Sequence, residues 1–319
     1  MITTETINRI VRFTGNGLPV VSLYVRVPTD LSSRGAMVRS QVDSRLHEIR
    51  PMAKDHAQQQ SWPPGTVALF SCSGRGFFEQ VQLPRGIRDR VIVDETPWVR
   101  SLLAVPDEYH RCGVAVVHRD SARMWEFYLD EWGEAGTLRL SADPGRNDHK
   151  ADELTKRHFR QVVTMLEELL QTHGCELLTI GGPQPELPRF LDFLPSDLRG
   201  RVAGTFTVDE ATFTVGDVEQ RASAVVDRYE RSEEQRLVAE AVDTAAAGGL
   251  ATVGLPPCLW AGSVAAVSQL MVQDEAVTPG VICDHDRWLA LDGQTCPLCE
   301  RPVRQVPDII DELVRGGHR

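Results

Sequence analysis

The first third of the chain alternates between β-rich and helical patterns of apolar residues. Val20–Val27 (VVSLYVRV) is rich in β-branched residues, which is typical of a strand. Apolar residues recur at helical spacing over residues 36–60, and Val67–Cys72 and Phe77–Leu83 read as two strands joined by a glycine-containing turn. These patterns predict one compact α/β unit that continues to about His110.

The middle third predicts a β-meander followed by alternating helices and strands. We expect Gly181 and Gly182 to stop the strand that precedes them. Because helices that alternate with strands cover a sheet, this order implies a layered α/β unit. The expected strands are Gly113–His118, Ala122–Leu129, a third near Gly136–Leu140, Glu176–Ile180 and Arg201–Phe206, and the expected helices are Ala151–Thr172 and Glu186–Phe193.

The last third opens with good helix formers over Val215–Ala247, which predict a long, acidic, solvated helix. This helix either connects to a third unit or offers a docking surface for a basic partner. Beyond it we expect strands at Ala251–Gly254 and Ala266–Val272 and helices at Pro256–Ser263 and Val306–Arg315. The fold class is therefore α/β (α+β), with three domains at residues 1–110, 111–212 and 213–319 and a cysteine-rich insertion at 283–299.

Composition narrows the classes of function. The chain has 319 residues, 34 Lys and Arg against 45 Asp and Glu, and a formal net charge of −11. A surface that is basic all over, as in proteins that bind nucleic acid by bulk attraction, is excluded, although local basic patches are not. No apolar run reaches the roughly 18 to 20 residues of a membrane span, so we expect a cytoplasmic protein with no membrane partner.

The cysteines point to a metal rather than to disulfide bonds. Seven cysteines are too few for a disulfide scaffold, and Cys296 and Cys299 form a Cys-x-x-Cys pair near Cys283. Zinc takes four such ligands in a tetrahedron, and His285 or Asp286 would supply the fourth. The predicted site is a structural zinc on Cys283, His285, Cys296 and Cys299; a ribbon that has lost its metal and a redox pair are the alternatives.

Cys72, Cys112, Cys175 and Cys258 stand in apolar contexts, and we expect them to be buried. The sequence has no phosphate loop, no Gly-x-Ser-x-Gly elbow and no His-Glu-x-x-His motif. We therefore assign no catalytic residue and expect no small-molecule substrate.

Two segments carry local positive charge. The polar loop Ser141–Lys150 (SADPGRNDHK) precedes a helix with Lys156, Arg157 and Arg160 near its start, where cations oppose the helix dipole. The loop is either a solubilising hinge or a finger that contacts RNA. The segment with Arg34, Arg39, Arg45, Arg50 and Lys54 is either a solvated helix face or a phosphate-binding face.

The order of parts resembles the archaeo-eukaryotic class I release factor and Pelota family, in particular its divergent bacterial branch. The resemblance covers nearly the whole chain and rests on pattern and order, with only the last cysteines forming a sharp motif. The segments that carry it are Val20–Val27, Gly113–Leu129 (GVAVVHRDSARMWEFYL), Leu177–Pro183 (LLTIGGP), Leu198–Phe206 (LRGRVAGTF) and a carboxy-terminal domain interrupted by Cys283, Cys296 and Cys299.

The resemblance implies a protein shaped like transfer RNA. Its middle domain would be ribonuclease-H-like, and its third domain similar to kink-turn-binding ribosomal proteins, with a small zinc-ribbon insertion. The partners would be the ribosome, through ribosomal RNA of the A site, and a translational GTPase such as elongation factor Tu. Family members usually continue into a last strand after the position of Gly316-Gly317, so either the chain is truncated or its third domain lacks an edge.

The chain lacks the tripeptide that release factors use for peptide release, and this absence determines the function that we expect. Release factors carry Gly-Gly-Gln on the middle-domain loop to position water, and this tripeptide occurs nowhere here; the corresponding loop has only Pro144-Gly145-Arg146. Without the two glycines and the amide, the loop lacks the parts that bring water to the ester. The stop-codon motifs of release factors are also missing from the first domain.

The resemblance therefore implies a ribosome-binding factor without catalysis, acting in hibernation or rescue by occupying the A site, as a bacterial hibernation factor of this family does. Its phosphate contacts would come from Arg34, Arg39, Arg146 and Lys150. Two alternatives stay open. One is an enzyme that cleaves peptidyl-tRNA or RNA through Asn147, Asp148 and His149, and the other is a protein-interaction scaffold clipped by zinc.

Overall fold

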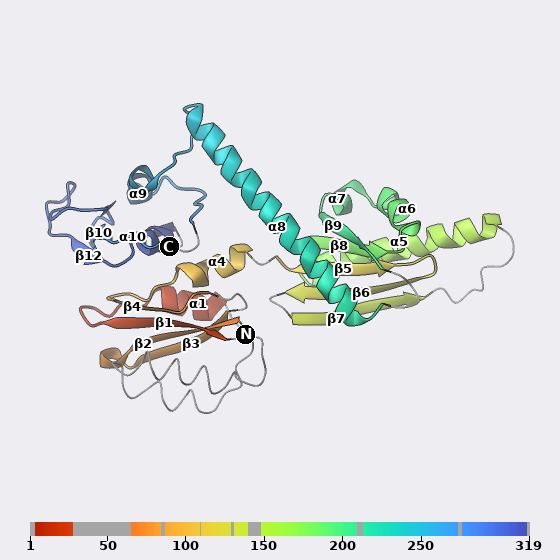
Figure 1. Ribbon diagram of the computed structural model, residues 1–319, viewed down its shortest axis with the longest axis horizontal. Helices are drawn as coiled ribbons and strands as arrows, with labels where there is room; N and C mark the ends of the chain where they lie inside the picture. The colour runs from red at the N-terminus through yellow and green to blue at the C-terminus, as the bar shows by residue number, and fades with distance from the viewer. Residues whose placement is uncertain are drawn as a thin grey trace. The chain divides into compact units, whose positions relative to one another are not determined.

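The computed structural model describes residues 4–27, 65–83, 87–108, 110–128, 131–139, 148–208, 213–273 and 276–317. The chain forms two compact units (Figure 1). Unit 1 joins Met1–Val105 to Glu240–Arg319, and unit 2 comprises Pro106–Ala239. Residues 1–105 and 240–319 therefore pack together, whereas the division into three domains stays a prediction from sequence. The helix expected over residues 36–60 lies outside the described residues.

The amino-terminal part of unit 1 is an antiparallel sheet of four strands in the order β3-β2-β1-β4. The predictions for β1 and β3 are confirmed at both ends, and β2 begins slightly earlier than expected. The elements are α1 (Thr4–Val11), β1 (Val20–Val27), β2 (Gly65–Cys72), the 3-10 turn η1 (Ser73–Arg75), β3 (Phe77–Leu83), β4 (Arg90–Asp94) and α4 (Arg100–Glu108).

Strand β1 has buried side chains on both faces of this sheet, which explains its nearly continuous apolar sequence. Leu23 and Val25 pack with Val67 and Leu69 of β2 on one face. On the other face, Tyr24 donates a hydrogen bond to the carbonyl of Trp98 at 2.7 Å. The Trp98 amide in turn donates to the Ser22 hydroxyl at 2.7 Å, so both backbone groups of residue 98 are held by β1.

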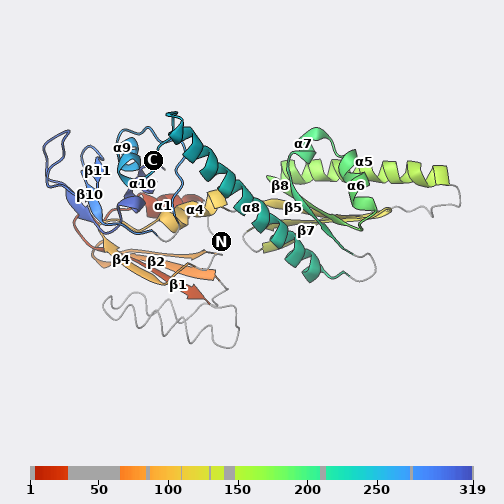
Figure 2. The same ribbon diagram turned by 45° about the horizontal axis from the view of Figure 1, so that its top comes forward.

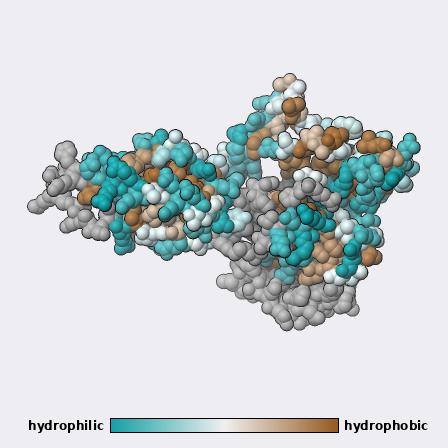
Figure 3. All heavy atoms as spheres, turned by 180° about the vertical axis from the view of Figure 1, so that it is seen from behind, coloured by the Kyte–Doolittle hydropathy of each residue, from teal (hydrophilic) through white to brown (hydrophobic). Residues whose placement is uncertain are grey.

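The carboxy-terminal part of unit 1 contains a sheet of three short antiparallel strands in the order β11-β10-β12. Figure 2 shows this part of unit 1 from a second side. The elements of this part are α9 (Leu255–Ser263), β10 (Gly280–Ile282), β11 (Leu289–Ala290), β12 (Arg304–Val306) and α10 (Ile309–Gly317). The strands expected at 251–254 and 266–272 are wrong, because both segments are irregular in the structure. Large hydrophobic side chains remain exposed in this part, among them Leu250, Val253 and Val264, and Figure 3 shows hydrophobic groups on one face of the molecule.

Unit 2 is built on a mixed sheet of five strands in the order β7-β6-β5-β8-β9. Strands β5, β6 and β7 form antiparallel pairs, whereas β5, β8 and β9 run parallel to one another. The elements are β5 (Cys112–Val117), β6 (Ser121–Tyr128), β7 (Glu131–Arg139), α5 (Asp148–Thr172), β8 (Leu177–Gly182), α6 (Glu186–Phe193), α7 (Ser196–Arg199), β9 (Val202–Thr207) and α8 (Val215–Ala246).

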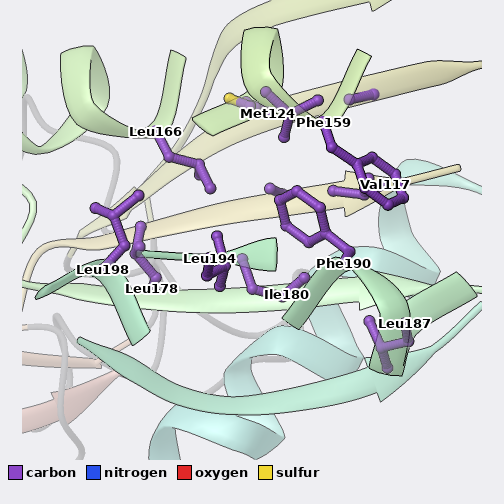
Figure 4. Close-up of a cluster of buried hydrophobic side chains, with 13 residues drawn as sticks. Val117, Met124, Phe159, Leu166, Leu178, Ile180, Leu187, Phe190, Leu194 and Leu198 are labelled. Atoms are coloured by element: carbon purple, nitrogen blue, oxygen red, sulfur yellow. The ribbon is translucent and has the colours of Figure 1, made fainter. Parts of the chain in front are cut away.

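Helices cover both faces of this sheet, and the alternation along β5 shows how. Ala115 and Val117 point into a core shared with Phe159 of α5 and Phe190 of α6, where side chains from helices and strands meet in Figure 4. Cys112, Val114 and Val116 point to the opposite face, where Val218, Ala222, Val225 and Val226 of α8 pack. A strand buried on both faces needs an apolar residue at every position, as β5 has.

Strand β8 continues through Gly181 and Gly182, so the prediction that these glycines end it at Ile180 is wrong. A Cβ atom on Gly181 would lie 2.4 Å from the Phe206 ring, and one on Gly182 would lie 2.5 Å from the carbonyl oxygen of Val117. The two glycines therefore permit close packing inside the sheet rather than a turn.

The two longest helices, α5 and α8, carry many charged residues along their length. Within the described part of the chain, no helix combines the length and apolar character that crossing a bilayer demands.

Candidate functional site

Three cysteines and one aspartate meet beside the small sheet of unit 1. The ligand atoms of Cys283, Asp286, Cys296 and Cys299 all lie within 4.8 Å of one another. The sulfurs of Cys283 and Cys299 are 3.7 Å apart. Four zinc bonds in a tetrahedron, with Zn–S at about 2.3 Å, place two sulfurs about 3.8 Å apart, so the donor set fits this ion.

Two turns of the same construction build this site. In the first, the amide of Arg287 donates to the carbonyl of Cys283 at 2.8 Å, and the amide of Cys283 donates to the carbonyl of Trp288 at 2.9 Å. In the second, Glu300 donates to Cys296 at 2.9 Å, and Cys296 donates to Arg301 at 2.8 Å.

The backbone conformation of the two turns agrees as well. Arg287 and Glu300 both have φ of 60°, a left-handed conformation that is uncommon for residues other than glycine. Each follows directly after the second ligand of its turn, Asp286 in one and Cys299 in the other. Asp286 therefore takes the place that Cys299 takes in the second turn, and a carboxylate replaces a thiolate.

This geometry corrects one residue of the predicted metal site. Of the two candidates for the fourth ligand, His285 and Asp286, the structure places Asp286 in the group. The His285 side chain is 51% exposed, and its Nδ1 lies 2.9 Å from Oδ1 of Asp286. His285 thus contacts the group from outside and holds the carboxylate of Asp286.

The amide groups of the first turn support the thiolate form of Cys283. Burial raises the pKa of this thiol, but hydrogen bonds to the sulfur from its surroundings, beginning with the amide of Asp286 at 3.4 Å, bring the net pKa below its ordinary value. The thiolate is the form that binds metal.

Charged side chains connect the cysteine cluster to a buried group of residues in unit 1. Arg287 lies 3.4 Å from the carboxylate of Glu312 in α10, which is almost fully buried. Arg304 of β12 contacts Asp284 at 3.3 Å and Asp94 of β4 at 2.9 Å. The position of the metal-binding turn is therefore tied to both α10 and β4.

The buried group itself, which we call the charged joint, consists of Trp98, Arg100, Asp308, Asp311 and Arg315. Oδ1 of Asp311 accepts the amides of Val99 and Arg100 at 2.8 and 2.7 Å, so it satisfies donors at the first turn of α4. The indole of Trp98 donates to Asp308 at 2.8 Å. The joint thereby fixes the start of α4 to α10.

Arg315 of α10 is the fully buried cation of the charged joint. Its guanidinium donates to the carbonyls of Val11 and Pro97 and contacts Asp311 at 3.4 Å. Burial raises the pKa of Asp311 to about 6, although the charge of Arg315 opposes this shift. Sequence reasoning missed these residues, because acids and bases on an amphipathic helix ordinarily indicate a solvated face.

The predicted RNA-binding residues fall largely outside the described part of the chain. Arg34, Arg39 and Arg146 lie in segments that the structure does not describe. Lys150 belongs to the first turn of α5, which begins at Asp148, earlier than predicted. In the sequence, Arg146 falls between the end of β7 and the start of α5.

Further along α5, Lys156 forms an exposed ion pair with Glu153 at 3.2 Å. Arg157 and Arg160 are exposed, and neither forms an ion pair with another described residue. The early part of this helix, which follows the predicted contact loop in the sequence, therefore offers cations to solvent.

The remaining histidines and cysteines are buried in the fold or contact a carboxylate. His118 and His158 are buried, and burial lowers the pKa of His158. Nδ1 of His110 lies 2.7 Å from the carboxylate of Glu176. Of the four cysteines expected to be buried, Cys72, Cys112 and Cys175 are, and Cys258 is half-buried.

Comparison with known proteins finds a family of proteins that the middle part of the chain matches. Residues 97–234 match bacterial archaeo-eukaryotic release factor family 10. This segment includes every strand of unit 2 and the first part of α8. Over this segment the chain is similar to that bacterial family of release factor relatives, in agreement with the resemblance seen in the sequence.

Several solved structures are similar to the chain at low identity. An archaeal termination factor, aRF1, is 18% identical over 82% of this chain and 83% of its own, with a TM-score of 0.32. Pelota of Archaeoglobus fulgidus is 12% identical over 76% and 66%, with a TM-score of 0.34. An archaeal Pelota described as ribosome-bound, with ABCE1, is 13% identical over 99% and 87%, with a TM-score of 0.39. No curated protein matches the chain.

Proposed function

We propose that the protein is a translation factor that binds the ribosomal A site in hibernation or rescue and does not release the nascent peptide. The observation that carries the proposal is the match of residues 97–234 to a bacterial release factor family in a chain without Gly-Gly-Gln. A translational GTPase such as elongation factor Tu is the proposed partner of the carboxy-terminal part.

The proposed loss of peptide release rests on the chemistry of the loop between β7 and α5. Residues 140–147 read Leu-Ser-Ala-Asp-Pro-Gly-Arg-Asn, with one glycine and no glutamine. Attack on the ester of peptidyl-tRNA needs a water held in line with the carbonyl carbon, and misplacing such a group removes most of the rate enhancement. A loop with Arg146 instead suits contact with phosphate.

The strand order of unit 2 supports the proposed ribonuclease-H-like character of the middle domain. Three antiparallel strands come first in sequence, and two parallel strands then add to the other side of β5. This arrangement is a scaffold, and its chemistry depends on the residues placed on it. Among the described residues of unit 2, no group of metal-ligating side chains of the kind that cleaves RNA is present.

Ribosome binding is tested by co-sedimentation with 70S ribosomes over a range of salt concentrations. If Arg34, Arg39, Arg146 and Lys150 contact phosphates, binding should weaken steeply with salt, with a slope of about −0.7 to −0.9 per phosphate neutralised. Reversing these four charges should abolish binding. Absence of the protein from ribosome fractions at low salt would refute the proposal.

A second measurement separates binding from catalysis. Ribosomes stalled with labelled peptidyl-tRNA should retain the peptide when the protein is added. Release of the peptide would instead support the hydrolase alternative, and its loss on replacing residues 144–149 would assign it to the loop.

We also propose that Cys283, Asp286, Cys296 and Cys299 hold a structural zinc ion. The fit of the sulfur spacing and the matched construction of the two turns support this assignment. All four positions are used by protein ligands, so the ion would have no open position for substrate and would act by fixing the two turns.

A further inference from the structure

A basic groove lies on unit 2 between strand β9 and the first half of α8. It has a volume of about 360 Å³ and is lined by Thr205, Phe206, Thr207, Arg221, Ala224 and Arg228. This volume is at the small end of the range of ligand-binding clefts. Both guanidinium groups belong to exposed residues, so a ligand can reach them from solvent.

The position of the groove follows from how α8 packs. Val218, Ala222, Val225 and Val226 bury one side of the helix against the sheet. Arg221 and Arg228 are seven residues apart, which is about two helical turns, so they project on the same side of α8. β9 is an edge strand of the sheet, and this side of the helix runs beside it.

Both arginines are held in place by backbone carbonyls. Arg221 donates to the carbonyl of Thr207 at 2.8 Å, and Arg228 donates from Nε to the carbonyl of Ala224 at 3.1 Å. A guanidinium has five N–H donors, so each group keeps donors for a ligand. Within the described residues, neither arginine makes an ion pair, and no carboxylate lines the groove.

The charge of Arg221 acts on Asp217, one turn earlier in α8. Its carboxylate is already engaged, because Oδ2 accepts the amide of Thr214 at 2.8 Å and the Thr214 hydroxyl at 2.7 Å. These hydrogen bonds, more than the charge of Arg221, lower the pKa of Asp217. Asp217 therefore serves the start of α8, and its carboxylate forms no ion pair with Arg221.

We propose that this groove binds the phosphate groups of RNA, as a contact separate from the loop between β7 and α5. Arginine binds phosphate in a bidentate manner, and threonine hydroxyls commonly add hydrogen bonds to phosphate oxygens. The two arginines are about 10 Å apart along the helix axis, which suits phosphates linked in a chain better than one free ion. The choice of RNA among phosphate ligands rests on the proposed function.

The test is fluorescence anisotropy with the full-length protein and a labelled oligouridylate, which offers phosphates without a folded shape. We expect the double variant R221Q/R228Q to bind at least tenfold more weakly than the unaltered protein. Its salt slope should also fall by about two, since two phosphate contacts are lost. Equal affinity of the two proteins, or no binding by the unaltered protein, overturns the proposal.

The matched control is R236Q. Arg236 lies on the same helix and its substitution removes the same charge, but its guanidinium contacts Glu233 at 2.8 Å. This variant should keep its affinity, and a loss as large as that of the double variant overturns the proposal by showing a general charge effect. An unchanged melting temperature of R221Q/R228Q shows that losing the bond from Arg221 to Thr207 does not unfold the unit.

Competitors identify the source of the phosphate. Displacement of the oligonucleotide by unlabelled RNA supports the proposal, whereas displacement by inorganic phosphate at equal phosphate concentration assigns the groove to a free ion. Displacement by polyglutamate at equal charge assigns it to an acidic peptide, and either of these results overturns the RNA assignment.

Ribosome co-sedimentation separates this inference from the proposed function. If the unaltered protein binds ribosomes and R221Q/R228Q binds them equally, the groove contact is refuted and the proposed function stands. If the unaltered protein does not bind ribosomes, the proposed function fails, and the oligonucleotide measurement still decides whether the groove binds RNA phosphate.

Discussion

In both units helices pack against sheets, but the interactions that hold them there differ. In unit 2, α5 and α6 pack on the sheet through apolar side chains such as Phe159, Leu166 and Phe190. In unit 1, α10 is joined to α4 and β1 by the charged joint, in which Asp311 and Arg315 are both buried. Apolar contacts depend on shape and area, whereas buried ionic contacts depend on every partner being present.

The comparison also concerns distance along the chain. Unit 2 is one continuous segment, but the bond from Arg100 to Asp311 joins residues 211 positions apart. A buried charge pair is specific, since only a matching partner at the right distance compensates for lost hydration. The charged joint therefore gives unit 1 a definite pairing of its two distant segments.

We expect the largest loss of stability in unit 1 when its proposed zinc site is removed. Cys296→Ser should lose one bound zinc per chain and lower the stability of unit 1, because the energy of metal binding contributes to folding. Hydrogen exchange should increase in β10, β12 and α10, while β5 and β8 of unit 2 stay protected. Elemental analysis gives the metal content.

Two variants sharpen this prediction. Cys258→Ser, outside the cluster, should keep the zinc, and Asp286→Cys should bind it more tightly, because a fourth thiolate completes the pattern of the second turn. A protein that is purified without zinc and does not take it up refutes the site.

The second effect tests the charged joint directly. Arg315→Ala leaves the carboxylate of Asp311 buried without its charged partner, and we expect it to reduce the free energy of unfolding by about 3 to 5 kcal/mol. Leu166→Ala in unit 2 should cost about 2 to 5 kcal/mol through a cavity. Urea denaturation gives both values.

Hydrogen exchange then locates the two losses. Arg315→Ala should expose amides of unit 1, in α1, α4 and α10, and Leu166→Ala those of unit 2, in α5 and β8. The exposed Arg12→Ala is the control, with a change within about 0.5 kcal/mol. If Arg315→Ala costs no more than this control, the charged joint is not what holds unit 1.

The third effect probes close packing within unit 2. Gly182→Ala should cost about 1 to 3 kcal/mol, because its Cβ would meet the backbone carbonyl of Val117 at 2.5 Å. Gly200→Ala, where the nearest atom is 3.5 Å away, should be tolerated and serves as the control. Equal stability of the two variants in urea denaturation would contradict the packing role of Gly182.

The smallest effect is a pH dependence of opposite sign in the two units. The pKa of Asp311 is raised to about 6, so folded unit 1 takes up a proton between pH 7 and pH 5 that the unfolded chain does not, and acid stabilises it. The pKa of His158 is lowered, so the unfolded chain takes up the proton first below about pH 6.5, and acid destabilises unit 2.

Hydrogen exchange at pH 7 and pH 5, corrected for the intrinsic rate, measures this difference in α4 and in α5. Asp311→Asn should flatten the response of unit 1, and His158→Phe that of unit 2. A shift of both units in the same direction would contradict the assignment.

The sequence predicts the elements of unit 2 well, because local patterns decide them. The burial of β5 on both faces and the helical period of α5 are visible in the order of apolar residues. Residues 181 and 182 were misread since glycine favours turns in general, and only the neighbouring Phe206 ring and Val117 carbonyl show that a side chain would not fit there.

Prediction is poorer in unit 1 because its structure depends on distant partners. Segments 251–254 and 266–272 have residues that suit strands, but no neighbouring strand pairs with them and most of their side chains are exposed. The start of α10 was also predicted too early, at Val306. The carboxylate of Asp308 accepts the amide of Ile310 at 3.2 Å and so caps the helix, which begins at the next residue, Ile309.

The metal site was predicted in part. The Cys-x-x-Cys spacing is a local signal, and it indicates three of the four residues that the structure brings together. The choice between His285 and Asp286 depends on the shape of a turn, which the spacing alone did not reveal. Matching the first turn to the second, position by position, is the signal that identifies Asp286.

The contact from Asp311 to the start of α4 has a consequence for biosynthesis. The ribosome makes α4 roughly 200 residues before it makes α10. Until then the first amides of α4 lack this acceptor, and the Tyr24 side of the nascent sheet lacks its cover. The amino-terminal segment therefore completes its fold only after α10 has been made, and until then its unpaired groups and apolar surface stay open to wrong contacts.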